Sequence, residues 1–150
     1  TAPQKYTFKD GDTTRTAFKP DRLIFCRESV QGMAICGKYA ALSLSYGALN
    51  AKLALYKNPL STPPTKVSFK PAGQSKTFSA EAWELADEKN WLKTAEIAAG
   101  SEDLEFDGTS IYVTFEGASQ NYRQKWISIN PLVKISDRFY LIKPADILKK

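Results

Sequence analysis

The chain has 150 residues, 43% hydrophobic and 25% charged, with a formal net charge of +5; these values are typical of one globular domain, so we expect a single domain over 1–150. No apolar run approaches the roughly 20 residues that cross a bilayer, so no membrane span is expected. Histidine is absent, which excludes Ser-His and Cys-His nucleophile pairs and histidine metal sites.

Apolar and polar residues alternate with a period of two along the first half of the chain, which is typical of strands. The segment 33–46 is long enough for one bent strand or two. In the proline-rich connector 58–74 only 66–70 can pair, because proline lacks the N–H group of a sheet ladder. The strands predicted in this half cover residues 6–9, 13–18, 22–27, 33–46, 51–56 and 66–70.

The segment 79–99 carries the signals of a helix. Ser79 is a candidate N-cap, Glu81 suits the positive end of the helix dipole, and Gly100 is suited to end the helix. The apolar residues fall on two different faces, so we expect a break near Lys89-Asn90. The sequence predicts a short helical insertion at about 79–99.

The remaining chain returns to alternation, and its predicted strands cover residues 110–116, 125–129 and 139–143. Turns at Asn130-Pro131 and Ser136-Asp137 separate the last two. Counting the whole chain gives roughly eight to ten strands and one helical segment. The predicted fold class is therefore mainly β: an antiparallel β-sandwich or barrel with the short helical insertion at about 79–99.

Two cysteines, Cys26 and Cys36, flank the polar turn 28–32. Adjacent antiparallel strands would bring them together, so a disulfide is favoured over two separate buried thiols. Such a bond indicates an oxidising compartment. The chain opens Thr-Ala-Pro-Gln without an initiator Met, so we expect a secreted or periplasmic protein whose leader has been removed.

Charge is segregated along the chain. Residues 1–78 hold 12 basic and 4 acidic side chains, residues 79–107 hold 2 and 9, and residues 108–150 hold 7 and 3. Either the acidic segment packs on a basic face, which we favour, or the two signs occupy separate surfaces and the basic one attracts an anionic partner. Nucleic acid is disfavoured, because neither an Arg/Lys-rich run nor an aromatic RNA-binding signature is present.

The motifs of catalysis are weak. The spacing Gly32 to Gly37-Lys38 resembles a phosphate-binding loop, but Tyr39 replaces the Ser or Thr and the context is strand-like, so no cofactor is expected. A carboxylate pair is the remaining route to catalysis, as in glycoside hydrolysis. The candidate carboxylates, which we interpret as solvated side chains, are Glu81, Glu84, Glu102, Glu105 and Asp107. No metal site is expected, since these residues lack the ligand spacing of a calcium loop.

The segment 117–123 joins two predicted strands and is small and polar until Tyr122 and Arg123, residue types enriched at interface hot spots. A projecting hairpin loop with a binding role is one interpretation, and an ordinary solvated loop is the other. Tyr112 and Trp126 are expected to share a nearby face as an aromatic platform, unless Trp126 belongs to the core. The candidate binding residues are Ser119, Gln120, Asn121, Tyr122, Arg123, Tyr112 and Trp126.

These observations favour a non-catalytic binding protein that occupies the surface of a protein partner, a class that covers enzyme inhibitors, immunity proteins and effectors. The alternative is a module that binds carbohydrate or an anionic polymer through a basic, aromatic surface. A carboxylate-dependent glycoside hydrolase is the least favoured of the three. The sequence leaves the partner, the source and the oligomeric state open.

Overall fold

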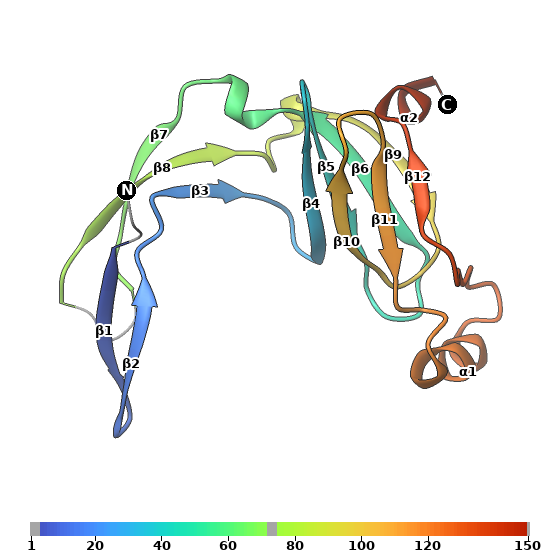
Figure 1. Ribbon diagram of the computed structural model, residues 1–150, viewed down its shortest axis with the longest axis horizontal. Coiled ribbons are helices and arrows are strands. Elements are labelled where there is room, and N and C mark those ends of the chain that lie inside the picture. Colours follow the sequence, from blue (N-terminus) through green and yellow to red (C-terminus); the bar gives the residue numbers. More distant parts are fainter. Residues whose placement is uncertain (1–3, 72–74, 150) are drawn as a thin grey trace. The chain divides into compact units, whose positions relative to one another are not determined.

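The computed structural model describes residues 4–71 and 75–149 and is mainly β (Figure 1). Contacts divide the chain into two compact units. Unit 1 comprises the described residues up to Phe25 and those of Thr62–Glu84, and unit 2 comprises Cys26–Ser61 and the described residues from Leu85 onward. One domain over 1–150 stays a prediction, because a compact unit is not by itself an independently folding domain.

Unit 1 is a hairpin and a small mixed sheet. Its strands are β1 (Lys5–Asp10), β2 (Thr13–Phe18), β3 (Arg22–Phe25), β7 (Thr65–Phe69) and β8 (Phe78–Glu84). β1 and β2 pair antiparallel, while β8 pairs parallel with β3 and antiparallel with β7. Tyr6 of the hairpin packs on Phe78 with ring centroids 5.4 Å apart. The Trp83 indole donates a hydrogen bond of 2.9 Å to the Thr62 carbonyl, which links β8 to the residues just before β7.

Unit 2 holds two antiparallel sheets with the orders β4-β5-β6-β9 and β10-β11-β12. Its strands are β4 (Val30–Cys36), β5 (Tyr39–Leu44), β6 (Ala51–Lys57), β9 (Trp91–Ile97), β10 (Ser101–Phe106), β11 (Ile111–Phe115) and β12 (Tyr140–Ile142). Its helical segments are η1 (Pro59–Ser61), η2 (Glu88–Asn90), α1 (Gln120–Ile129) and α2 (Pro144–Lys149). Figure 1 shows the three-stranded sheet lying over the four-stranded one.

The core of unit 2 lies between these two sheets. Strand alternation directs one side of each sheet inward, so that Ala41 and Leu55 of the large sheet meet Val113 of the small one. Ile147 of α2 joins the same cluster, whose other buried members are Ala34, Cys36, Ala51, Leu53, Ile97, Leu104 and Ile111. The mainly-β fold class is confirmed, with a sandwich-like arrangement in unit 2. Among the described strands each sheet is open, so the barrel alternative is not realised.

A glycine allows strands β4 and β10 of the two sheets to approach each other closely. A Cβ placed on Gly32 of β4 would lie 2.5 Å from the Glu102 carbonyl oxygen and 2.8 Å from the Leu104 nitrogen, both in the backbone of β10. Nearby, the buried hydroxyls of Ser43 and Ser101 share a hydrogen bond that joins β5 to β10. Backbone-to-backbone contact of this kind requires a residue without a side chain.

The predicted helical insertion at 79–99 is wrong. The segment forms β8 and β9, which are separated by the short η2 turn at the position where a break was expected. Helix propensities differ by less than about 0.7 kcal/mol for ordinary residues, so tertiary pairing overrides them. Here β8 pairs with β3 and β7, and β9 pairs with β6.

The strand predicted at 125–129 is also wrong, because these residues form the second half of α1. The alternation of Trp126-Ile127-Ser128-Ile129 is too short to distinguish a strand from a helix. Strand β10 and helix α2 were not predicted at all. The phosphate-loop-like segment from Gly32 to Lys38 is strand β4 and the hairpin turn into β5. No helix of the described residues has the length and hydrophobicity needed to cross a membrane.

Replacing Gly32 with Ala tests the contact between β4 and β10. We expect Gly32→Ala to lower the free energy of unfolding by about 2 kcal/mol, because overpacking against rigid backbone cannot be relieved by a side-chain movement. Gln31→Ala, a change at an exposed neighbour on the same strand, is the matched control. Urea denaturation followed by circular dichroism measures both variants. Equal stability of the two would contradict the close contact.

Candidate functional site

The predicted loop at 117–123 is the start of a helix. Ser119 occupies the N-cap position of α1 without a side-chain cap hydrogen bond, and Gln120, Asn121, Tyr122 and Arg123 form the first turn. The projecting hairpin loop is therefore wrong. The same residues nevertheless remain exposed, so they stay candidates for recognition on a helix surface.

Trp126 anchors α1 to the rest of unit 2. It is only 6% exposed, and its indole lies so close to Gly100 and Gly117 that a Cβ on either glycine would come within 2.8 Å of the ring. Tyr122, one turn earlier, stacks on it with centroids 5.2 Å apart. Trp126 therefore serves packing, as the alternative interpretation of this residue held, and Tyr122 borders both the core and the solvent.

The end of α1 is held as well. The Asn130 side chain donates a hydrogen bond of 2.9 Å to the Ala48 carbonyl in the loop between β5 and β6, and its oxygen accepts from the Leu132 backbone N–H. The helix therefore has two anchors, because Trp126 holds its second half and Asn130 its C-terminus. Such a helix presents a preformed surface to solvent.

We define the α1 surface as a groove of about 180 Å³ together with the exposed apolar residues beside it in the chain. Ile129 is 64% exposed and Leu132 is 84% exposed. The groove is lined by Ala118, Arg123, Ile127, Val133, Ile135 and Asp137. The surface thus combines large apolar side chains with a guanidinium group, the composition of many protein interfaces.

Tyr112 lies on another surface, the outer face of β11. Its hydroxyl donates a hydrogen bond of 2.9 Å to Asp107, and its ring lies 6.2 Å from that of Phe139. Hydrogen bonds from the Ser110 and Thr109 backbone and from Tyr112 hold the pKa of Asp107 below its usual value, and the same carboxylate raises the pKa of Tyr112. The aromatic neighbours of Tyr112 and Trp126 differ, so the predicted platform of these two residues is not formed.

The acidic segment 79–107 is distributed over several strands. Some of its carboxylates meet basic side chains, as in the pairs Glu81 with Arg22 and Glu96 with Lys134. Asp103 and Glu105 instead lie on the outer face of β10, beside Tyr112. The segment is therefore partly neutralised by local ion pairs and partly an exposed acidic face.

The candidate catalytic carboxylates are divided between the two units. Glu81 and Glu84 belong to unit 1, whereas Glu102, Glu105 and Asp107 belong to unit 2. Glu102 has a raised pKa, first because burial disfavours its charge and then because Glu116 lies beside it. No cluster of three or more metal-ligating side chains occurs within residues 4–71 and 75–149.

The expected disulfide is absent, and both cysteines are free thiols. The geometric premise fails because β4 pairs with β5 and β3 pairs with β8, so the strands that precede and contain the two cysteines are not neighbours. Cys26 is exposed and Cys36 is buried, and burial raises the pKa of the Cys36 thiol to about 11. A secreted or periplasmic location rested on this bond and stays a prediction.

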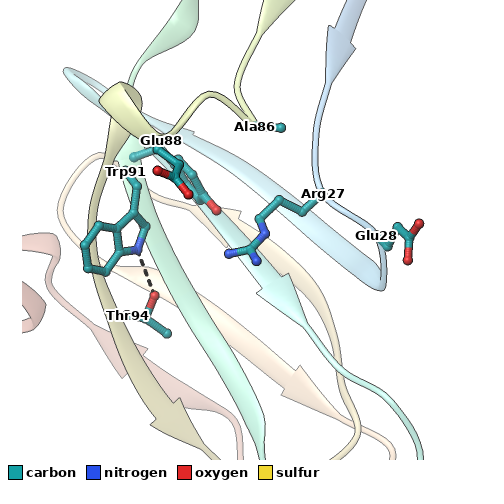
Figure 2. Close-up of a pocket in the computed structure, with 7 residues that line it drawn as sticks. Arg27, Glu28, Ala86, Glu88, Trp91 and Thr94 are labelled. Atoms are coloured by element: carbon teal, nitrogen blue, oxygen red, sulfur yellow. Dashed lines mark hydrogen bonds between the residues drawn. The ribbon is translucent and has the colours of Figure 1, made fainter.

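A second site, which we call the β9 pocket, lies on the side of the large sheet that faces away from the small one. It has a volume of about 840 Å³ and is lined by Arg27, Glu28, Tyr56, Ala86, Glu88, Trp91 and Thr94 (Figure 2). A β-bulge shapes it: Leu55 pairs with Lys93, but Tyr56 pairs with Trp91, so one residue of β9 is unopposed. The bulge lets Trp91 and Thr94, three positions apart, share one face, and their side chains form a hydrogen bond of 3.0 Å.

None of the residues that line this pocket is predicted from the sequence as a site residue. Tyr56 belongs to a correctly predicted strand, but nothing in an alternating pattern shows that a tyrosine hydroxyl will lack a partner. Trp91 lies in the segment 79–99, for which the sequence predicts a helix, whereas the structure places it at the start of strand β9. The one available signal was the Trp91 to Thr94 spacing, which becomes informative only when the bulge is known.

Comparison of the chain with protein-family models, with curated protein sequences and with solved structures returned no match.

The cysteine state is directly testable in the native protein. We expect Ellman's reagent to label the exposed Cys26 alone before denaturation and both thiols afterwards, because burial and a raised pKa keep Cys36 unreactive. Cys26→Ser is the control and should show almost no labelling while folded. An intact mass that increases by the mass of two hydrogen atoms on reduction would show a disulfide and contradict the assignment of two free thiols.

Proposed function

We propose that this chain is a non-catalytic binding protein that acts on a protein partner through the α1 surface. The observation that supports it most is the exposure of large apolar side chains on an anchored helix and the segment after it. Ile127 is 47% exposed, beside Ile129 and Leu132. Contiguous patches of exposed apolar side chains that are bordered by polar residues are typical of protein interaction sites.

The charge of this surface indicates the chemistry of the partner. Residues 118–138 contain four basic side chains and one acidic side chain. Lys134 and Arg138 lie near the carboxylates of Glu96 and Asp137, so Arg123 and Lys125 carry most of the net positive charge. We therefore propose a partner with an acidic, partly apolar surface, since complementary potential favours association and like charges disfavour a second copy of this chain.

The anchors of α1 support a rigid mode of binding. Trp126 fixes the helix against Gly100 and Gly117, and Asn130 fixes its end to the β5–β6 loop. A preformed surface loses little conformational entropy on association, so a small groove bordered by exposed apolar side chains can support useful affinity. Inhibitor, immunity and effector roles all belong to this class.

The test begins with capture of partners from an extract of the source, using the unchanged chain and the double variant Arg123→Ala, Ile127→Ala as parallel baits. A protein retained by the first bait and lost from the second is then purified and titrated. We expect the double variant to weaken its binding tenfold or more, about 1.4 kcal/mol, because both groove-lining contacts are removed. Thermal unfolding of the variant should match that of the unchanged chain.

Gln124→Ala is the matched control, since Gln124 is an exposed residue of the same helix that does not line the groove. It should bind like the unchanged chain. Affinity that is equal for all three proteins would rule out the α1 surface. Retention of the same partners by both baits would also rule out the α1 surface.

A further inference from the structure

We propose that the β9 pocket is a second, separate binding site that takes a short neutral oligosaccharide. Its residues come from the segment after β3, from β6, from η2 and from β9, all within unit 2. None of them belongs to the α1 surface, so this site does not depend on the proposed protein interface.

The pocket contains an aromatic stacking surface. Trp91 of strand β9 lines the pocket, and 48% of this large aromatic residue is exposed. Its indole N–H is already occupied by the Thr94 hydroxyl, which fixes the orientation of the ring. A fixed indole that offers its face to solvent suits the apolar face of a sugar ring, which packs on aromatic side chains.

The pocket also contains an unused hydrogen-bonding group. Tyr56 is only 1% exposed, and its hydroxyl has no hydrogen-bond partner among the residues that the structure describes. Buried polar groups are almost always paired, and an unpaired one is costly to stability. Tyr56 lines the pocket as the cross-strand neighbour of Trp91, so a ligand hydroxyl over the indole would lie close to it.

Two side chains of opposite charge lie at the mouth of the pocket. Figure 2 shows the Arg27 guanidinium and the Glu88 carboxylate reaching toward each other across the pocket, while Glu28 points away. No ion pair involving Arg27 or Glu88 occurs among the described residues. A planar donor and a planar acceptor on opposite sides can each bind a pair of adjacent sugar hydroxyls.

These features favour a neutral sugar over a charged ligand. The Glu88 carboxylate faces the Arg27 guanidinium across the pocket, so an anion such as a phosphate that binds the guanidinium would also meet a like charge. A single amino acid would leave most of the 840 Å³ filled with water, whereas two or three sugar rings suit a volume of this size.

The experiment screens the intact chain with six trisaccharides by saturation-transfer NMR: maltotriose, cellotriose, laminaritriose, xylotriose, mannotriose and chitotriose. Affinities of those that bind are then measured by calorimetry. We expect at least one to bind, with Trp91→Ala reducing affinity at least tenfold because the stacking surface is lost. The control is Phe139→Ala, which removes an aromatic ring from the residue just before β12. Phe139 is 60% exposed and lies outside the pocket, so binding should be unchanged.

The sharper variant is Tyr56→Phe, which removes one oxygen atom and keeps the ring. It should weaken sugar binding about fivefold, the effect of one neutral hydrogen bond. It should not lower the stability of the free protein, because the hydroxyl has no partner there to lose. Tyr46→Phe, at a side chain 76% exposed, controls for the substitution itself.

Three results would overturn the proposal. One is failure of all six sugars to bind, and another is binding that Trp91→Ala and Tyr56→Phe leave intact. The third is a lower thermal stability of Tyr56→Phe without ligand, which would show that the hydroxyl is already hydrogen-bonded in the free protein.

Discussion

The backbone contact between β4 and β10 at Gly32 is the constraint on which the architecture of unit 2 depends. It brings the Gly32 Cα against Glu102 and Leu104, so the two sheets lie close enough for the short side chains Ala34 and Ala41 to fill the space between them. Ala34 pairs with Ala41, and the larger side chain of Leu55 lies beside Ala41 on the next strand of the same core. A bulkier residue at position 32 would separate the sheets and leave these alanines without contacts.

Once the sheets are fixed, the outer surfaces of unit 2 become available for binding, and each is shaped by one local irregularity. The bulge in β9 turns Trp91 toward Tyr56 and opens the β9 pocket. The two glycines under Trp126 allow α1 to lie flat on the end of the sandwich with its apolar residues outward. A rigid scaffold with exposed, preformed features is the arrangement expected of a protein that acts by binding.

The strands were predictable where alternation was reinforced by turns, as in 13–18, 51–56 and 110–116. The prediction failed at 79–99 because Ala, Glu and Leu favour helices in isolation, while pairing with β3, β6 and β7 decided the outcome. At 120–129 the β-branched Ile127 and Ile129 concealed a helix that is supported by the packing of Trp126 and by the i, i+4 stack of Tyr122 on it. The exposed residues of 119–123 were found from the sequence, but the disulfide and the β9 pocket depend on which strands are neighbours, which a single sequence does not contain.

Amide hydrogen exchange of the intact chain, followed by NMR, tests most directly whether one rigid sandwich carries these surfaces. If the Gly32 contact joins the two sheets, the amides of β5, β6, β10 and β11 will exchange slowest and with similar free energies of opening, as one cooperative unit. The amides of α1 will exchange faster, because only Trp126 of that helix is buried. Exchange of β10 and β11 as rapid as that of the loops, with β5 and β6 still protected, would contradict the account.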